Sequence, residues 1–212
     1  MEEVKIRLIF DRLKTMYPNL VCELNYENNY QLLVAVILSA QCTDKRVNMV
    51  TKELFKVAPT PEPMIQLGED RLKEIIRSCG FYNAKARNIM LATKALIEKH
   101  NSEVPSTRKE LVALNGVGEK TASVVLAVAF RVPAIAVDTH VFRLSSRIGF
   151  CNEKTPNDTM RRLQEIIPKE LWIDYHYALV LHGRYLCKAQ NPKCEMCKLK
   201  DLCKYAKERN YV

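Results

Sequence analysis

The sequence predicts an all-α protein. Apolar residues recur at the three- and four-residue spacing of amphipathic helices along most of the 212 residues. Proline, glycine and threonine stand where such segments begin or end. No stretch alternates apolar and polar residues for long enough to predict a sheet. We therefore expect helices joined by loops, without internal repeats or low-complexity segments.

The first half of the chain predicts six helices. The first covers residues 6–17 and stops at Pro18. Residues 30–40 are apolar on every side, which fits a buried helix or a buried strand, and their length and helical surroundings favour a helix. Asn83 is expected to cap a long helix that ends near His100. The remaining three helices cover residues 47–57, 60–68 and 72–80.

In the second half, capping residues mark the helix starts. Thr107 and Glu110 form a capping box for one helix. Thr155, followed by proline, begins another. The last long helix covers residues 171–186, and residues 132–134 are the expected crossing between two domains.

The charge balance predicts a polyanionic partner. Lys and Arg number 33 against 24 Asp and Glu, which gives a net charge of +9. Nucleic acid is the commonest such partner, a membrane surface fits less well, and solubility alone remains an alternative. The N-terminus lacks a secretory signal, and the longest apolar runs, residues 32–38 and 124–130, are too short to span a bilayer. We expect a soluble intracellular protein.

Four cysteines near the C-terminus are candidate metal ligands. Cys187, Cys194, Cys197 and Cys203 have the spacing C-x6-C-x2-C-x5-C. Four thiolates suit a tetrahedral zinc or a [4Fe–4S] cluster, and the wide outer gaps favour the cluster. Zinc and disulfides remain alternatives, although thiols stay reduced inside cells. The other four cysteines, Cys22, Cys42, Cys79 and Cys151, are interpreted as small core or surface residues.

Residues 114–122 predict a helix–hairpin–helix. Gly116 and Gly118 flank Val117, which would plug the junction of the two helices. The glycines let backbone N–H groups approach an anion at the start of the next helix, and DNA phosphate fits such a site. An ordinary turn between helices would explain the glycines equally well.

Lys120 falls in the first turn of the helix after the hairpin. A cation is disfavoured there, because the positive end of the helix dipole favours the neutral amine that a nucleophile requires. Binding phosphate or pointing to solvent would also explain this lysine.

Asp138 stands at the expected N-cap of another helix. A carboxylate held ionised at such a position can also stabilise positive charge on a reacting centre. The two roles are compatible.

The hairpin with its lysine, the Val137–His140 segment and the four-cysteine loop occur in that order, and their combination resembles the helix–hairpin–helix DNA glycosylases. The similarity is greatest to the endonuclease III family and covers essentially the whole chain. It includes residues 38–44, 80–86 and 181–184.

The resemblance implies an α-helical protein of two lobes with a C-terminal [4Fe–4S] cluster. Residues 22–132 would form a six-helix barrel containing the hairpin at about residues 107–130. Residues 1–21 and 133–212 would form the cluster domain, with DNA bound between the lobes. The implied activity is excision of oxidised pyrimidines from duplex DNA, followed by cleavage 3′ to the abasic site. The implied protein is a monomer of the bacterial cytoplasm, associated with the nucleoid.

The resemblance also assigns roles to residues. Lys120 would be the nucleophile, Asp138 its catalytic partner, and the four cysteines the cluster ligands. Relatives often carry an aliphatic residue where this chain has Phe81, and proline where it has Asn115. The implied DNA contacts are Gln41, Phe81, Gly116, Val117, Gly118, His140, Lys188 and Lys193.

Other functions remain to be separated by experiment. Adenine-mismatch glycosylases share the fold and cluster but generally lack the hairpin lysine, whereas oxidised-guanine glycosylases keep the lysine without such a cluster. A non-catalytic DNA-binding module and a redox-sensing iron–sulfur protein are alternatives from other classes.

Overall fold

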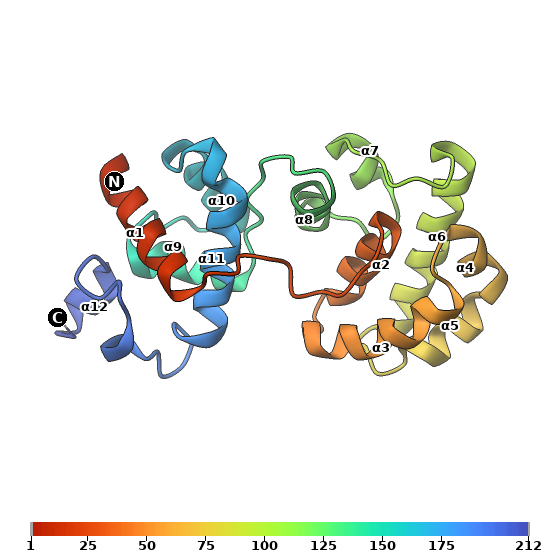
Figure 1. Cartoon of the computed structure of the whole chain (residues 1–212), viewed down its shortest axis with the longest axis horizontal. Helices are drawn as coiled ribbons and strands as arrows, with labels where there is room; N and C mark the ends of the chain where they lie inside the picture. Colours follow the sequence, from red (N-terminus) through yellow and green to blue (C-terminus); the bar gives the residue numbers. More distant parts are fainter. Residues whose placement is uncertain (1, 212) are drawn as a thin grey trace. The chain divides into compact units, whose positions relative to one another are not determined.

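The computed structural model describes residues 2–211, and every regular element within them is a helix. The predicted fold class is therefore confirmed. The chain forms two compact units, which divide between Val132 and Pro133 (Figure 1). Residues Glu23–Val132 make up one unit, here called the hairpin unit. The residues up to Cys22 and those from Pro133 onward make up the other, here called the cysteine unit.

The hairpin unit is built around one buried helix. It contains α2 (Asn29–Ser39), α3 (Asp44–Val57), α4 (Pro61–Leu67), α5 (Glu69–Ile76), α6 (Tyr82–His100), α7 (Arg108–Ala113) and α8 (Glu119–Ala129). Every residue of α2 from Tyr30 to Leu38 is buried, and α3, α6 and α8 pack around it. Helices that are apolar on all sides are found in such central positions, so the helical interpretation of this segment is confirmed.

A buried lysine joins two of these helices. Lys85 of α6 is 5% exposed, and its Nζ donates to the carbonyl oxygen of Leu38 at 2.8 Å. This bond satisfies a carbonyl of the last turn of α2, where no helical partner exists, and brings a cation to the negative end of the α2 dipole. It thereby fixes the point at which the chain leaves α2 towards Gln41.

The cysteine unit packs three helices around a second core. It contains α1 (Glu3–Met16), α9 (Thr139–Ile148), α10 (Pro156–Ile166), α11 (Trp172–Tyr185), α12 (Lys204–Glu208) and two short 3-10 turns, η1 (Lys169–Leu171) and η2 (Cys194–Met196). Helix α11 contacts both α1 and α9. Tyr175 of α11 is fully buried, stacks on Phe10, and donates its hydroxyl to the Ile6 carbonyl at 3.0 Å.

Most predicted helix starts agree with the structure, with local exceptions. The side chains of Thr107, Asp138 and Thr155 each accept backbone N–H bonds as N-caps. The prediction that Asn83 caps α6 was wrong: the cap lies two residues earlier, at Phe81, which has a left-handed backbone. The short helix α12 was not predicted. No helix within residues 2–211 is long and apolar enough to cross a membrane.

Candidate functional site

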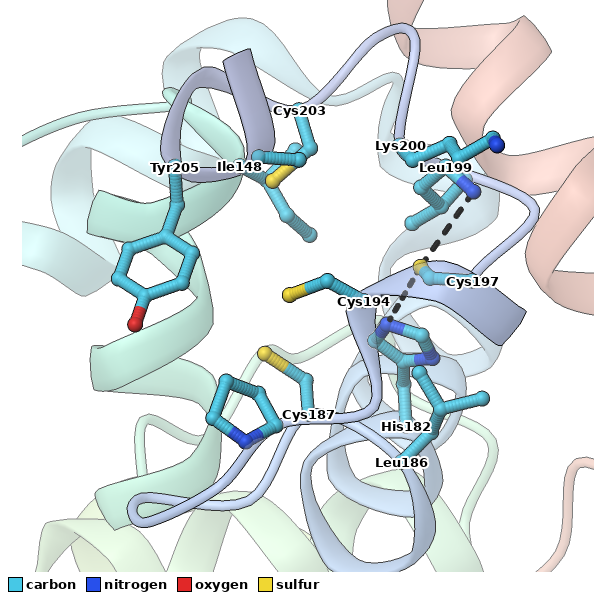
Figure 2. Close-up of a pocket in the computed structure, with 12 residues that line it drawn as sticks. Ile148, His182, Leu186, Cys187, Cys194, Cys197, Leu199, Lys200, Cys203 and Tyr205 are labelled. Atoms are coloured by element: carbon cyan, nitrogen blue, oxygen red, sulfur yellow. Dashed lines mark hydrogen bonds between the residues drawn. The ribbon is translucent and has the colours of Figure 1, made fainter. Parts of the chain in front are cut away.

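The four C-terminal cysteines line a single pocket in the cysteine unit. Figure 2 shows their sulfur atoms around this pocket, with Ile148, Leu186 and Leu199 among the apolar side chains beside them. Among the described residues 2–211, no three side chains of the usual ligand types converge on one metal-ion position. Sulfurs spread around a pocket fit the corners of an iron–sulfur cube better than a single tetrahedral zinc.

Hydrogen-bond donors face two of the sulfurs. The Arg147 guanidinium lies 3.4 Å from Cys187 Sγ, and the Leu199 backbone N–H donates to Cys197 Sγ at 3.4 Å. Burial raises the pKa of the Cys197 thiol to about 11, so without a metal this thiol would stay protonated. A bound iron would replace that proton, and the Leu199 N–H would then stabilise the Cys197 thiolate. The donor set and its surroundings fit a [4Fe–4S] cluster.

A buried histidine connects one cysteine to the N-terminal helix. His182 is 2% exposed, and its ring nitrogens lie 3.6 Å from Cys197 Sγ and 3.2 Å from the Tyr17 hydroxyl. Burial lowers the pKa of His182 to about 4, so the ring is neutral near pH 7. Burial, followed by the charges of Cys197 and Cys187, raises the pKa of Tyr17 to about 12. Tyr17 therefore donates to Nδ1, and Nε2–H can donate to a Cys197 thiolate.

Two arginines of α9 hold the loop that follows Cys187. Arg147 donates to the carbonyls of Lys188 at 2.7 Å and Ala189 at 2.9 Å, and lies 4.6 Å from the Tyr205 ring centre. Arg143 donates to the carbonyl of Cys187 at 3.0 Å. The loop is thus fixed by its backbone, while the side chains of Lys188 and Lys193 remain exposed.

The predicted hairpin lies between α7 and α8 in the hairpin unit. Gly116 has φ +77°, and a Cβ there would lie 2.9 Å from the Cβ of Asn88 on α6. Gly118 is the N-cap of α8, and a Cβ there would meet nothing within 4 Å. Val117 is buried and its N–H donates to the Leu114 carbonyl at 3.1 Å. Gly116 is therefore required by packing, whereas Gly118 leaves open space in front of the N–H groups of α8.

Lys120 is the second residue of α8 and is exposed. Its neighbour Glu119 pairs with Arg108 of α7 at 2.5 Å, and Arg108 also approaches the Ser123 hydroxyl at 3.3 Å. This pair ties the two hairpin helices together and occupies the only carboxylate of the first turn. The start of α8 thus offers backbone N–H groups and an exposed amine.

Asp138 is the N-cap of α9 in the cysteine unit. Its Oδ1 accepts the N–H groups of His140 at 2.9 Å and Val141 at 2.8 Å. His140 is half-buried, and burial is the main cause that lowers its pKa, so the ring is neutral near pH 7. A Cβ on Gly183 of α11 would lie 2.7 Å from the Cβ of His140. The glycine therefore lets α11 pass close to the start of α9.

Gln41 and Phe81 lie in neighbouring loops of the hairpin unit. Both have left-handed backbones, with φ 52° and φ 58°, which is unusual for residues other than glycine. Phe81 is 68% exposed, and Gln41 is also exposed. The Cβ position of Gly80 lies 3.5 Å from the Gln41 carbonyl oxygen. Strained backbone and an exposed aromatic ring point to a functional surface.

Comparison with known proteins identifies the family. A family model described as "HhH-GPD superfamily base excision DNA repair protein" matches residues 34–169, and a model of the iron–sulfur binding domain of endonuclease III matches residues 187–203. The chain belongs to the endonuclease III family. Endonuclease III of Haemophilus influenzae is 48% identical over 205 residues, 97% of each chain. The Bacillus subtilis protein is 46% identical over 207 residues, 97% of this chain and 94% of its own.

Solved structures of the family agree over the whole chain. A trapped covalent intermediate of endonuclease III with DNA has a TM-score of 0.93 at 48% identity, and the match covers 99% of both chains. A non-covalent endonuclease III–DNA complex also has a TM-score of 0.93, at 47% identity. The protein is a DNA glycosylase and abasic-site lyase of base excision repair, it binds DNA, and it carries a [4Fe–4S] cluster.

Sequence reasoning missed several residues of these sites. Arg143 and Arg147 hold the cysteine loop, and Lys85 fixes the end of α2. An arginine on a predicted helix is normally expected to face solvent, so nothing in the sequence indicated that Arg143 and Arg147 hold the loop. Lys85 had a weak signal, since it lies on the side of α6 with Ala86 and Ile89, which are buried.

Proposed function

We propose that this glycosylase excises oxidised pyrimidines of the thymine glycol type from duplex DNA and cuts the strand 3′ to the resulting abasic site through Lys120. The observation that carries the proposal is the exposed Lys120 in the first turn of α8, directly after the two hairpin glycines. It is supported by a relative, 48% identical to this chain, that was trapped as a covalent intermediate with DNA.

In this proposal the hairpin holds the DNA backbone. The open space around Gly118 lets a phosphate approach the first N–H groups of α8, where the helix dipole favours an anion. Val117 contributes as a buried plug, because its own N–H is already bonded to Leu114. Such contacts position the protein without reading sequence.

Lys120 and Asp138 carry out the chemistry. A damaged base must leave the stack before its sugar can be attacked, and damage lowers the cost of extrusion. Asp138 stabilises the positive charge that develops on the sugar as the base departs, through the same carboxylate that caps α9. The Lys120 amine attacks C1′ and forms an imine, and β-elimination then breaks the strand.

Gln41 and Phe81 act on the stack around the extruded nucleotide. Gln41 fills the vacated space, and the exposed Phe81 ring wedges between base pairs. Both residues have left-handed backbones, Gln41 just after the C-cap of α2 and Phe81 at the N-cap of α6. This assigns a use to two strained positions that packing within the hairpin unit does not require.

The cysteine unit contributes further DNA contacts. Cys187, Cys194, Cys197 and Cys203 ligate the cluster, which holds the loop in shape. Lys188 and Lys193 on that loop contact phosphates. His140, at the start of α9, donates a hydrogen bond to the DNA. We propose that the protein does this as a monomer on nucleoid DNA.

A cleavage assay on defined duplexes tests the proposal. Separate substrates carry one thymine glycol, one abasic site, or adenine in a mismatch. We expect the protein to cleave the thymine glycol and abasic-site duplexes with a β-elimination product, and to leave the mismatch duplex uncut. Excision of adenine alone, or binding without cleavage, would contradict it.

A further inference from the structure

Two cysteines outside the C-terminal array meet in the hairpin unit. Cys42 follows Gln41, and Cys79 comes two residues before Phe81. Both are free thiols, and the Cys42 thiol lies near enough to Cys79 to be among the groups that raise the Cys79 pKa. The neighbouring backbone agrees, since the Cβ position of Gly80 lies 3.5 Å from the Gln41 carbonyl oxygen. The two loops that carry Gln41 and Phe81 therefore lie close together, with one thiol on each.

The surroundings of the pair favour thiol chemistry. Cys42 is partly exposed and immediately precedes Thr43, the N-cap of the 14-residue helix α3, whose dipole favours negative charge at that end. Cys79 is 1% exposed, and burial raises its pKa to about 11. Lys85 and Arg46 lie near enough to oppose that rise. A reagent in solution therefore reaches Cys42 before Cys79, because Cys42 is partly exposed and Cys79 is buried.

We propose that Cys42 and Cys79 form a reversible disulfide that links the Gln41 loop to the Phe81 loop and weakens binding to damaged DNA. The oxidant is a low-molecular-weight disulfide. The Cys42 thiolate attacks one sulfur of this disulfide, forms a mixed disulfide and releases one thiolate. Cys79 then loses its proton to solvent and attacks the Cys42 sulfur, which releases the second thiolate. Two protein thiols lose two electrons and two protons, and the oxidant gains them as two free thiols.

The effect on DNA follows from the change in spacing. A disulfide bond of about 2.0 Å is shorter than any non-bonded approach of two sulfurs, so oxidation draws the loops together. The disulfide also restricts the distance between Gln41 and Phe81, which in the proposed function enter the base stack at different points. This consequence rests on the proposed function, whereas formation of the disulfide does not.

The test compares oxidised and reduced holoenzyme. The protein is incubated anaerobically with oxidised glutathione or with dithiothreitol, while visible absorption reports that the cluster is intact. Free thiols are then alkylated, and peptides are mapped. Binding is measured on a duplex with a non-cleavable abasic-site analogue. We expect a Cys42–Cys79 peptide only after oxidation, and a Kd that rises by at least about fivefold and returns with dithiothreitol.

Variants separate this bond from other oxidation. Cys42→Ala removes the attacking thiol and leaves Cys79 buried, so this variant should keep the affinity of the reduced enzyme in both conditions. Cys151→Ser, a matched change outside the pair, should respond to oxidation as the wild type does. Full alkylation of Cys42 and Cys79 after oxidation would overturn the proposal, and so would a mapped disulfide that leaves affinity unchanged. Mapping and binding require no catalysis, so a protein that fails to excise thymine glycol would refute the proposed function and leave this test standing.

Discussion

The two hairpin glycines should respond in opposite ways to the same substitution. Gly116→Ala places a Cβ at φ +77° and 2.9 Å from the Cβ of Asn88. A left-handed backbone costs a residue with a Cβ about 1–2 kcal/mol, and overpacking adds about 1–3 kcal/mol. The two contributions together predict a loss of about 2–5 kcal/mol in the free energy of unfolding. In a chain of this size each kcal/mol lowers Tm by roughly 2–4 °C, so Tm should fall by at least about 4 °C.

Gly118→Ala is the matched control for folding. Its φ of −88° suits any residue, and its Cβ would meet nothing within 4 Å. Stability should stay the same or rise by up to about 1 kcal/mol, because alanine restricts the unfolded chain. The added methyl group, however, stands in the space where we expect a phosphate. Affinity for duplex DNA should therefore fall about tenfold, which corresponds to about 1.4 kcal/mol.

Thermal unfolding and DNA titration of both variants check this reasoning. If Gly118→Ala binds DNA as tightly as the wild type, the hairpin is an ordinary turn between helices. A Gly116→Ala protein as stable as the wild type would show that the contact with Asn88 is relieved at no cost, and the packing argument would be wrong.

Three further outcomes are expected. Asp138→Asn should lose most base excision but keep its Tm and its affinity for abasic DNA, since an amide oxygen can still accept the two cap bonds; an unfolded variant, or one with wild-type excision, would contradict the catalytic role. Affinity for lesion duplex should fall steeply as salt rises, because the proposed contacts are to phosphates, and a nearly flat dependence would argue against them. The purified protein should be yellow-brown with about four iron and four sulfide per chain; stoichiometric zinc without visible absorption would exclude the cluster.

Local patterns predicted the fold class, and the signals that mark the candidate sites are also local. The cysteine spacing, the glycine pair and the capping residues Thr107 and Thr155 are signals that need no tertiary information. The buried helix α2 could be assigned because its apolar run is longer than a typical strand.

Features that depend on distant segments could not be predicted. Tyr17 and His182 are 165 residues apart in the sequence and meet only because α1 packs on α11. Cys42 and Cys79 look like separate core or surface residues in the sequence, and the fold brings them near one another. The prediction for the start of α6 was wrong for a local reason. Asn83 is a favourable cap, but the cap position lies two residues earlier, at Phe81.

The central claim is that Lys120 forms a covalent imine with the deoxyribose C1′ of damaged DNA. Borohydride reduces such an imine and traps the enzyme on DNA as a slowly migrating species. Wild-type protein and Lys109→Gln, which removes an exposed lysine from the neighbouring helix α7, should both be trapped. Lys120→Gln should give no adduct and no strand cleavage, yet retain its fold, its cluster and much of its DNA affinity. An adduct that persists in Lys120→Gln, or that peptide mapping assigns to another amine, would contradict the account.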